Sequence, residues 1–440
     1  MSEKKDKTIL KRACEAWTGA ADFRFRRERC KRFTYGDQWG DECVSHYRGV
    51  RLTDGERLAR QGRTPLTNNL IRQLVKTIIG RFRTQASEQG EYKDAMSRRN
   101  ALGELDSRML EEFLISGAAI QRLSNECREG GTGVWVDNVD PRRFFVNVFQ
   151  DPRGTDIELV GMLHDMGLPE LVSRYGHGSA ERCGFLEQVF ADCVSAGAYA
   201  PEKALGMPAA GSEDFFLPGD SAKMRVIEVW TLDASRREGG TYSFGWRCRV
   251  FAADGRRIDS FASPYRGGGH PFVVKFYPMT DGEVHSFVEG LIENQKYINR
   301  LISIADHIMA SSAKGALLFP INELPDNVRL DEVAQRWASP DAVIPLREGK
   351  VLPQQVATRG SADGACQLLT LQMKLFENST GVSDVLMGRN VSAAVGKDNY
   401  RARVETASIA LADLLDTFGS FLELRDRKAG IIAILQNKLQ

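Results

Sequence analysis

A chain of 440 residues with 42% hydrophobic content is too long for one simple core and should divide into two or three domains or sub-domains. Its 59 Lys and Arg residues nearly cancel 58 Asp and Glu residues, which excludes an overall charge that would hold the protein on nucleic acid or on an anionic membrane. The eight cysteines show no metal-ligand spacing, and the sequence has neither a recognisable signal peptide nor a membrane-spanning apolar run, so we expect free thiols, a reducing cytoplasm and no structural zinc.

The first part of the chain is predicted to be mainly helical. Residues 1–7 are charged and are expected to be disordered, whereas 9–39 carries apolar residues at helical spacing among many arginines. We interpret the latter as a helix with a solvated basic face rather than as a nucleic-acid contact. Further helices are predicted over 62–85 and over about 101–127. The helix over 62–85 has cap candidates and an apolar stripe, namely Thr67 or Asn68, and Leu70, Leu74, Val75 and Ile78.

Strand signals dominate the next part of the chain. Residues 133–137 and 143–149 have the composition of strands, and 168–176 has the pattern of a short helix. Alternation of apolar and polar residues then predicts a small sheet built from three segments, 224–233, 241–255 and 270–279.

The clearest helical periodicity predicts a helix over 285–313, roughly 43 Å long, which would pack along its length against other helices. Its stripe consists of Val288, Leu291, Gln295, Ile298, Ile302, Ala305 and Met309. The fold class that results is α+β, mainly α. The remaining predicted elements are short strands at 314–320 and 341–347, a helical turn at 330–338, and helices over 361–379 and from about 399 onwards.

The stretch "VLMGRNVSAAVGKDNYRAR" (385–403) separates the last two helices and contains a Gly-Lys pair, as phosphate-binding loops do. Other features of such a loop are missing, because Val391 stands where the first glycine belongs and Asp398 stands where a Ser or Thr would bind magnesium. An aspartate there would repel a triphosphate, so we do not expect nucleotide binding. Its glycines and small residues favour a backbone with several accessible conformations.

Five segments of the sequence, taken in their order, carry a likeness to a known family. They are "RFTYGDQWGD" (32–41), "GRTPLTNNLIRQLVKTIIGRFR" (62–83), "DPRGTDIE" (151–158), "GEVHSFVEGLIENQKYINRLISIADHIMASSAKGALLFP" (282–320) and "GVSDVLMGRNVSAAVGKDNYRARVETASIALADLLD" (381–416). Together with the succession of helix, small α/β insertion, helix, loop and helix, they resemble the portal proteins of tailed double-stranded DNA bacteriophages, the head-tail connector family. The resemblance implies a portal-like fold and a non-enzymatic protein that forms a dodecameric ring at one capsid vertex, the channel for genome packaging and ejection.

The resemblance also implies how the chain is divided and what it binds. As a portal protein, it would be assembled in the bacterial host cytoplasm and would act in the virion, at the portal vertex of the capsid. Its partners would be further copies of itself, double-stranded DNA in transit, the terminase large subunit, a head-tail adaptor and the major capsid protein, with no membrane, cofactor or metal. In chain order the parts would be the α+β wing (1–284), the first stem helix (285–313), the clip (314–358), the second stem helix (359–381), the tunnel loop (382–398) and a long wing or crown helix (399–440), with the crown short or absent.

Candidate site residues follow from the task of a channel, which contacts DNA without holding it. Each phosphate neutralised by Lys or Arg adds affinity and salt dependence, so a few cations per subunit, repeated by ring symmetry, suit this task. In the stem, Lys296 and Arg300 lie one turn apart, and they either face the channel or pair with Glu293 or with acids of a neighbouring subunit. The candidates in the tunnel loop are Arg389, Asn390, Ser392 and Lys397, and those for partner binding in the clip are Trp337, Arg347 and Lys350.

Two alternatives come from other classes of protein. A metal-dependent nuclease would use carboxylates that cluster in the sequence, although several of them neighbour Pro, Gly or Asn, where acids serve as turn residues. A helical scaffold or adaptor of the virion would share the long amphipathic helices but would form no closed ring. The carboxylates of the nuclease alternative are Asp137, Asp140, Asp151, Asp156, Glu158 and Asp165.

Overall fold

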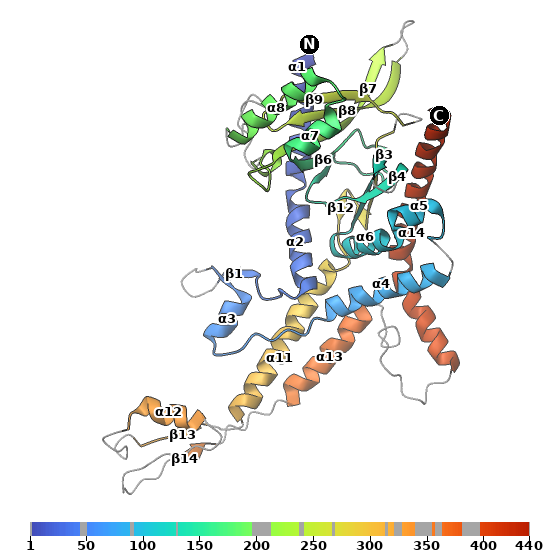
Figure 1. Cartoon of the computed structure of the whole chain (residues 1–440). Helices are drawn as coiled ribbons and strands as arrows, with labels where there is room; N and C mark the ends of the chain where they lie inside the picture. Colours follow the sequence, from blue (N-terminus) through green and yellow to red (C-terminus); the bar gives the residue numbers. More distant parts are fainter. Residues whose placement is uncertain are drawn as a thin grey trace. The chain divides into compact units, whose positions relative to one another are not determined.

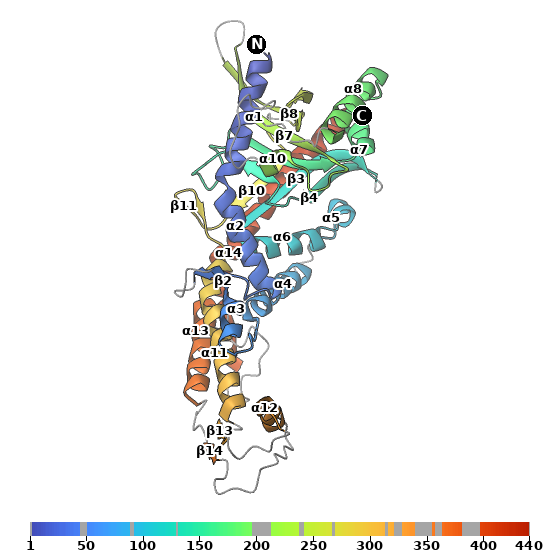
Figure 2. The same cartoon turned by 90° about the vertical axis from the view of Figure 1, so that its left-hand side faces the viewer.

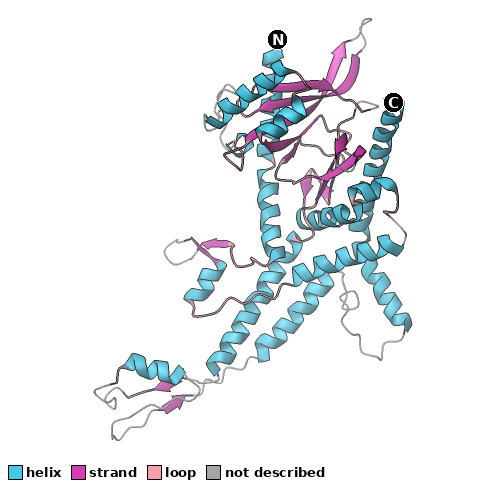
Figure 3. Cartoon of the chain, viewed as in Figure 1, coloured by secondary structure: helices cyan, strands magenta, loops and turns pink. Residues whose placement is uncertain are grey.

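The computed structural model of the chain forms two compact units, which are described in turn (Figure 1). The first consists of Met1–Gly36, Asn69–Ile292 and Thr380–Gln440, and the second of Asp37–Asn68 and Glu293–Ser379. The fold is mixed α+β and mostly helical, with several small antiparallel sheets (Figure 3). The structure describes residues 2–44, 51–88, 92–128, 131–195, 213–236, 242–265, 269–312, 316–320, 328–338, 354–356, 363–380 and 397–439.

The larger sheet of the first unit is an antiparallel meander of five strands in the order β5-β6-β7-β8-β9. Its two longest neighbours, β7 and β8, pair from Val226 opposite Ala252 to Arg236 opposite Tyr242. The predicted strands at 224–233 and 241–255 are therefore confirmed. The strands are β5 (Phe144–Val146), β6 (Leu159–Met166), β7 (Met224–Arg236), β8 (Tyr242–Ala252) and β9 (Arg257–Ala262).

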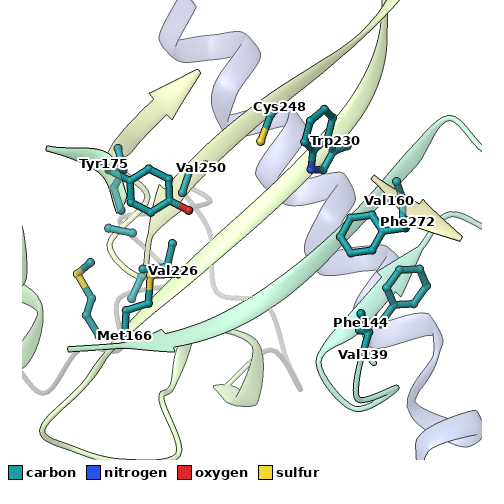
Figure 4. Close-up of a cluster of buried hydrophobic side chains, with 14 of the residues drawn as sticks. Val139, Phe144, Val160, Met166, Tyr175, Val226, Trp230, Cys248, Val250 and Phe272 are labelled. Atoms are coloured by element: carbon teal, nitrogen blue, oxygen red, sulfur yellow. The ribbon is translucent and has the colours of Figure 1, made fainter. Parts of the chain in front are cut away.

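Both faces of this sheet are covered, because side chains alternate between them along each strand. Ile227, Val229 and Phe251 pack on one face with α1 (Ser2–Gly19). The intervening residues Val226 and Trp230 belong to the cluster on the other face, to which α7 (Leu168–Tyr175) and α8 (Ala180–Ser195) contribute (Figures 2 and 4). The short helix predicted at 168–176 is confirmed by α7.

A smaller antiparallel sheet, in the order β10-β3-β4, lies in the same unit. Its strands are β10 (Phe272–Phe276), β3 (Ala118–Arg128) and β4 (Gly131–Asn138), which confirms the strands predicted at 133–137 and 270–279. The prediction that 270–279 shares a sheet with 224–233 and 241–255 is wrong, because β10 pairs with β3. The prediction of one helix over 101–127 is wrong. Helix α6 (Leu102–Ser116) ends at Gly117, whose φ of +75° stops it, and the apolar residues that follow form the central strand β3.

The N-terminal prediction also needs correction. Residues 2–7 are not disordered but form the start of α1, where Lys5 binds Asp233 at 3.1 Å. The single helix predicted over 9–39 is two helices, because α1 ends at Gly19 and α2 spans Ala21–Tyr35. Its basic face is not simply solvated, since Arg27 is buried and makes two hydrogen bonds of 2.8 Å to Glu112.

The remaining helices of the first unit agree closely with the periodicity of the sequence. Helix α4 spans Leu70–Glu88, its predicted stripe is buried, and its cap is Asn69 rather than Thr67 or Asn68, because the Asn69 side chain accepts a hydrogen bond from the Arg72 N–H. Helix α14 spans Lys397–Leu439 and packs on β3 and β10. Shorter elements are α5 (Ala95–Asn100), α10 (Glu213–Phe216), β11 (Met279–Thr280), β12 (Glu283–Val284) and the 3-10 turn η1 (Glu289–Leu291).

The second unit is built around α11, which spans Ile292–Ser312. The predicted start at 285 is wrong by seven residues, so the helix is roughly 31 Å long rather than 43 Å. The predicted turn at 330–338 is confirmed by α12, and the helix at 361–379 by α13. The predicted strand at 341–347 lies outside the described residues. The other elements are β1 (Glu42–Val44), β2 (Arg51–Thr53), α3 (Asp54–Arg60), β13 (Ala316–Leu318), α12 (Leu330–Ala338), β14 (Gln354–Val356) and α13 (Asp363–Thr380).

No helix in the described ranges combines the length and the apolar composition that crossing a bilayer requires.

Candidate functional site

Helix α11 carries a row of buried polar side chains. Gln295, Asn299 and Ser303 follow one another at steps of four residues, and each is at most 1% exposed. They face the segment 37–68, because the Asn299 Oδ1 accepts a 3.1 Å hydrogen bond from the Asn68 N–H and the Ser303 hydroxyl accepts one of 2.9 Å from the Leu66 N–H. The helix therefore binds an irregular backbone through polar groups, as well as packing through its apolar residues.

Lys296 lies beside this row and is engaged within the chain. Its Nζ is 2.7 Å from Asp54 Oδ2 and 3.3 Å from Asp41 Oδ2, and the side chain is 18% exposed. Burial alone would lower the pKa of Lys296, but the hydrogen bond and the charges of these acids hold it above the ordinary value. The ion-pair alternative thus describes Lys296. Asp54 and Asp41 are its ion-pair partners, and the predicted Glu293 adds a smaller favourable charge.

Arg300 lies one turn further along α11 and is half-buried, and its surroundings differ from those of Lys296. In the described part of the chain, no carboxylate lies within ion-pair distance of its guanidinium. Of the two stem candidates, Arg300 therefore differs from Lys296 in having no acidic partner among the described residues.

Helix α13 presents an apolar stripe to its surroundings. Leu368, Leu371 and Leu375 are 43%, 51% and 44% exposed, at the three- and four-residue steps that place them on one face. Phe376 is fully buried and marks another face of the same helix. Such a stripe is typical of a helix that packs against neighbours.

The other predicted site residues are only partly covered by the structure. Trp337 lies in α12 and is half-buried. Lys397 is the first residue of α14, and its side chain is not among those described. The candidates Arg347, Lys350, Arg389, Asn390 and Ser392 lie outside the described residues.

The carboxylates of the nuclease alternative do not converge on one site. Asp137 binds Arg128 at 2.6 Å, Asp165 binds Arg225 at 2.6 Å, and Asp156 accepts hydrogen bonds from backbone N–H groups. Asp140, Asp151 and Glu158 have arginine partners of their own, Arg142, Arg153 and Arg12. Over the described ranges, no group of three or more His, Cys, Asp or Glu side chains is placed to hold a metal ion.

A buried charge network that sequence reasoning missed lies in the first unit. The fully buried Glu228 of β7 is 3.3 Å from Arg122 Nη2 and 2.9 Å from His164 Nε2, and its Oε1 accepts a 2.8 Å bond from the Trp230 indole. Burial would raise the pKa of this carboxyl, but Arg122 and His164 hold it well below its usual range. An adjoining cavity of about 530 Å³, also lined by Tyr265, contains none of the predicted channel residues.

The comparison with protein families decides what these elements belong to. Residues 226–429 match the phage P22-like portal protein family. The chain is similar to that family over 204 of its 440 residues, just under half of its length. The matched region begins in β7, contains α11, α12 and α13 and ends in α14. A search among curated proteins found no match.

Portal proteins are structural, non-enzymatic components of the virion, and this sets the nuclease alternative aside. This similarity agrees with the resemblance drawn from the sequence, since two of its five segments, 282–320 and 381–416, lie wholly in the matched region.

Proposed function

We propose that this portal-family chain is the subunit of a ring at one capsid vertex, which serves as the channel for packaging and ejecting the genome. The observation that carries the proposal is the succession of α11, a small insertion, α13, a connecting segment and α14 within the region that matches the family. In this assignment α11 and α13 are the stem, 314–358 the clip, 382–398 the tunnel loop, and residues 1–284 with α14 the wing.

Exposed apolar surface on α13 supports assembly. A helix whose leucine stripe is about half exposed gains free energy by burying it against neighbouring copies, at about 25 cal/mol per Å² of apolar area. The scaffold or adaptor alternative offers no reason for a closed arrangement of such helices.

The proposed contacts with DNA are made by few cations. We assign this role to Arg300 in the stem and to Arg389 and Lys397 in the tunnel loop, with Asn390 and Ser392 as polar neighbours. Lys296 is assigned to the fold of the second unit because two aspartates already bind it. Trp337, Arg347 and Lys350 are the proposed contacts of the clip with the terminase large subunit and later with a head-tail adaptor.

Mass photometry of the purified protein at moderate salt tests the proposal. A subunit of 49.0 kDa predicts, for a dodecamer, a dominant species of about 590 kDa. A stable monomer or dimer at every protein and salt concentration would favour the adaptor alternative.

A further inference from the structure

The outer edge of strand β4 is occupied by side chains of α5 rather than by another strand. In the three-stranded sheet, β4 pairs with β3 on one side, and its other side is an edge of the sheet. The short helix α5 lies beside this edge (Figures 1 and 2). An open edge presents unpaired N–H and C=O groups, to which strands of other molecules can bind. The groups that cover the edge therefore decide what can pair with it.

The covering contacts follow the alternation of the strand. Neighbouring residues of an edge strand point their backbone groups to opposite sides, so those of Thr132, Val134 and Val136 share the outer side. The Val136 N–H donates to Asn100 Oδ1 at 2.9 Å, and Asn100 Nδ2 donates to the Val134 carbonyl at 3.0 Å. Arg99 Nη1 donates to the Thr132 carbonyl at 3.3 Å. Because a side-chain amide carries the donor and acceptor of a peptide group, Asn100 and Arg99 take the positions of a fourth strand.

Both side chains are held in place for these contacts. Asn100 is 7% exposed, and its Nδ2 makes a second hydrogen bond, of 3.0 Å, to the Met96 carbonyl within α5. Gly133 leaves the space that Arg99 fills, because a Cβ on Gly133 would lie 2.9 Å from the Arg99 Cζ, closer than two non-bonded carbon atoms approach. The helix and the strand are thus fitted to each other at two positions.

The sequence of the edge indicates what would bind there if the edge were open. Residues 132–136 read TGVWV, which contains no charge and no proline, and Val and Trp are among the residues that favour strands. An edge of this composition lacks the charges and prolines that prevent pairing with other molecules. Antiparallel pairing of β4 with β4 across a two-fold axis would satisfy the same backbone groups in both chains. The partner that fits the open edge is therefore a second copy of this chain.

We propose that α5 is a built-in cover, which keeps β4 from pairing with the β4 strand of a second copy. Arg99 and Asn100 close the edge, and the rest of α5 positions them. The cover acts within one chain, so the proposal does not depend on whether the chain forms the proposed ring. Its consequence is that copies of the chain meet through surfaces other than the small sheet.

Replacing residues 95–100 by a Gly-Ser linker of equal length tests the proposal, because it removes the cover and leaves the sheet. Mass photometry of the full chain is expected to show species of at least twice the wild-type mass, in a fraction that rises with protein concentration. Hydrogen exchange followed by mass spectrometry reports on the edge itself. The amides of 131–138 should exchange faster than in the wild type when the variant is dilute, and should be protected again in the heavier species.

A second change in the linker variant locates the association. Thr132→Pro removes an N–H that points to the outer edge and no bond to β3, so it should restore the wild-type mass. A matched control is Arg98→Ala, on the exposed side of α5, because no hydrogen bond from the Arg98 side chain to β4 is seen in the described ranges. This control should have the wild-type mass. Circular dichroism checks that every variant is folded.

The outcomes decide the proposal. A folded linker variant that keeps the wild-type mass at every concentration overturns it. Heavier species in which 131–138 stays unprotected, or which persist with Thr132→Pro, overturn it as well, because the association then uses another surface. If the linker variant does not fold, Arg99→Ala combined with Asn100→Leu takes its place, with the same expected results in a smaller fraction of the protein. A folded double variant that has only the wild-type mass then overturns the proposal.

Discussion

At the scale of single residues, the first unit contains buried charges that have partners of opposite sign. Arg425 of α14 donates to both carboxylate oxygens of Asp106 of α6, at 2.5 and 2.6 Å, and the two side chains are 3% and 0% exposed. A buried pair of this kind adds little net stability, but removing one partner leaves an unpaired charge in the interior. The pair therefore fixes where α14 lies on the first unit.

Asp106→Ala is expected to lower the free energy of unfolding by about 3–5 kcal/mol. Urea denaturation followed by circular dichroism measures the change. Asp106→Leu combined with Arg425→Leu should recover much of the loss, since no charge is then left buried. A control is Arg153→Ala, whose ion pair with Asp151 is on the surface, and for which no measurable change is expected. A double variant as unstable as Asp106→Ala would contradict this explanation.

His270 gives the first unit a dependence on pH. Burial, with a smaller contribution from the charge of Lys428, holds the pKa of His270 well below its usual value, and its Nδ1 accepts a 3.3 Å bond from the Phe272 N–H. The unfolded chain takes up this proton at about pH 6.5 and the folded chain only at much lower pH. Stability should therefore be complete above that pH and fall as the pH is lowered from 7 to 5.

The slope of unfolding free energy against pH, measured in wild type and in His270→Gln, checks this expectation. The variant should be less stable at pH 7 and should have a shallower slope between pH 7 and 5. Equal slopes in the two proteins would assign the pH dependence to other groups.

At the scale of elements, Gly117 separates a helix from a strand. Its φ is +75°, and a Cβ there would lie 2.5 Å from the Tyr277 carbonyl oxygen and 2.8 Å from a Val284 methyl group. Gly36, at the end of α2, has a φ of +106° but no atom within 4 Å of an added Cβ. The two glycines differ in crowding more than in backbone conformation.

Gly36→Ala is accordingly expected to cost about 1 kcal/mol, the strain of a left-handed backbone. Gly117→Ala should cost a further ~1–3 kcal/mol, because β3 and the Tyr277 segment have to move apart. Thermal and urea denaturation of both variants give the comparison. Similar losses in the two variants would show that the close approach at Gly117 relaxes without cost.

The periodicity of apolar residues in the sequence predicted the elements that have one buried side and one solvent-facing side. Leu70, Leu74 and Val75 of α4 are such a case. It failed at β3, because a central strand buried on both faces has no alternation and continues the apolar composition of α6. It also placed Gln295 in an apolar stripe, although the four-residue spacing of Gln295, Asn299 and Ser303 was visible. Lys296 pairs with Asp41 and Asp54, which are more than 200 residues away in the sequence. The spacing of residues carries no information about such distant partners.

At the scale of the whole molecule, a ring repeats each residue once per subunit, so one cation becomes a circle of charge. Arg300→Ala is expected to lower the salt dependence of DNA binding by the assembled protein, by about 0.9 in the slope of log K against log [salt] for each phosphate that the arginine neutralises in the wild type. Lys296→Ala should leave that slope unchanged. It should instead accelerate hydrogen exchange of backbone amides in 51–68, because the ammonium group that joins Asp41 and Asp54 is then lost.

Fluorescence anisotropy of labelled duplex DNA over a salt series, with mass photometry to establish that each variant assembles, measures the slope. Equal changes of slope in the two variants would contradict the separate roles of Lys296 and Arg300.

The hydrogen bond from Gln295 Nε2 to the Asn68 carbonyl has a consequence for synthesis, since 227 residues separate its ends. At a translation rate of about 5–20 residues per second, residues 37–68 leave the ribosome roughly 10–45 seconds before the helix that binds them. Arg425 meets Asp106 later still, because 319 residues separate the two side chains. Each unit can therefore finish folding only after segments that lie far apart in the sequence have all been synthesised.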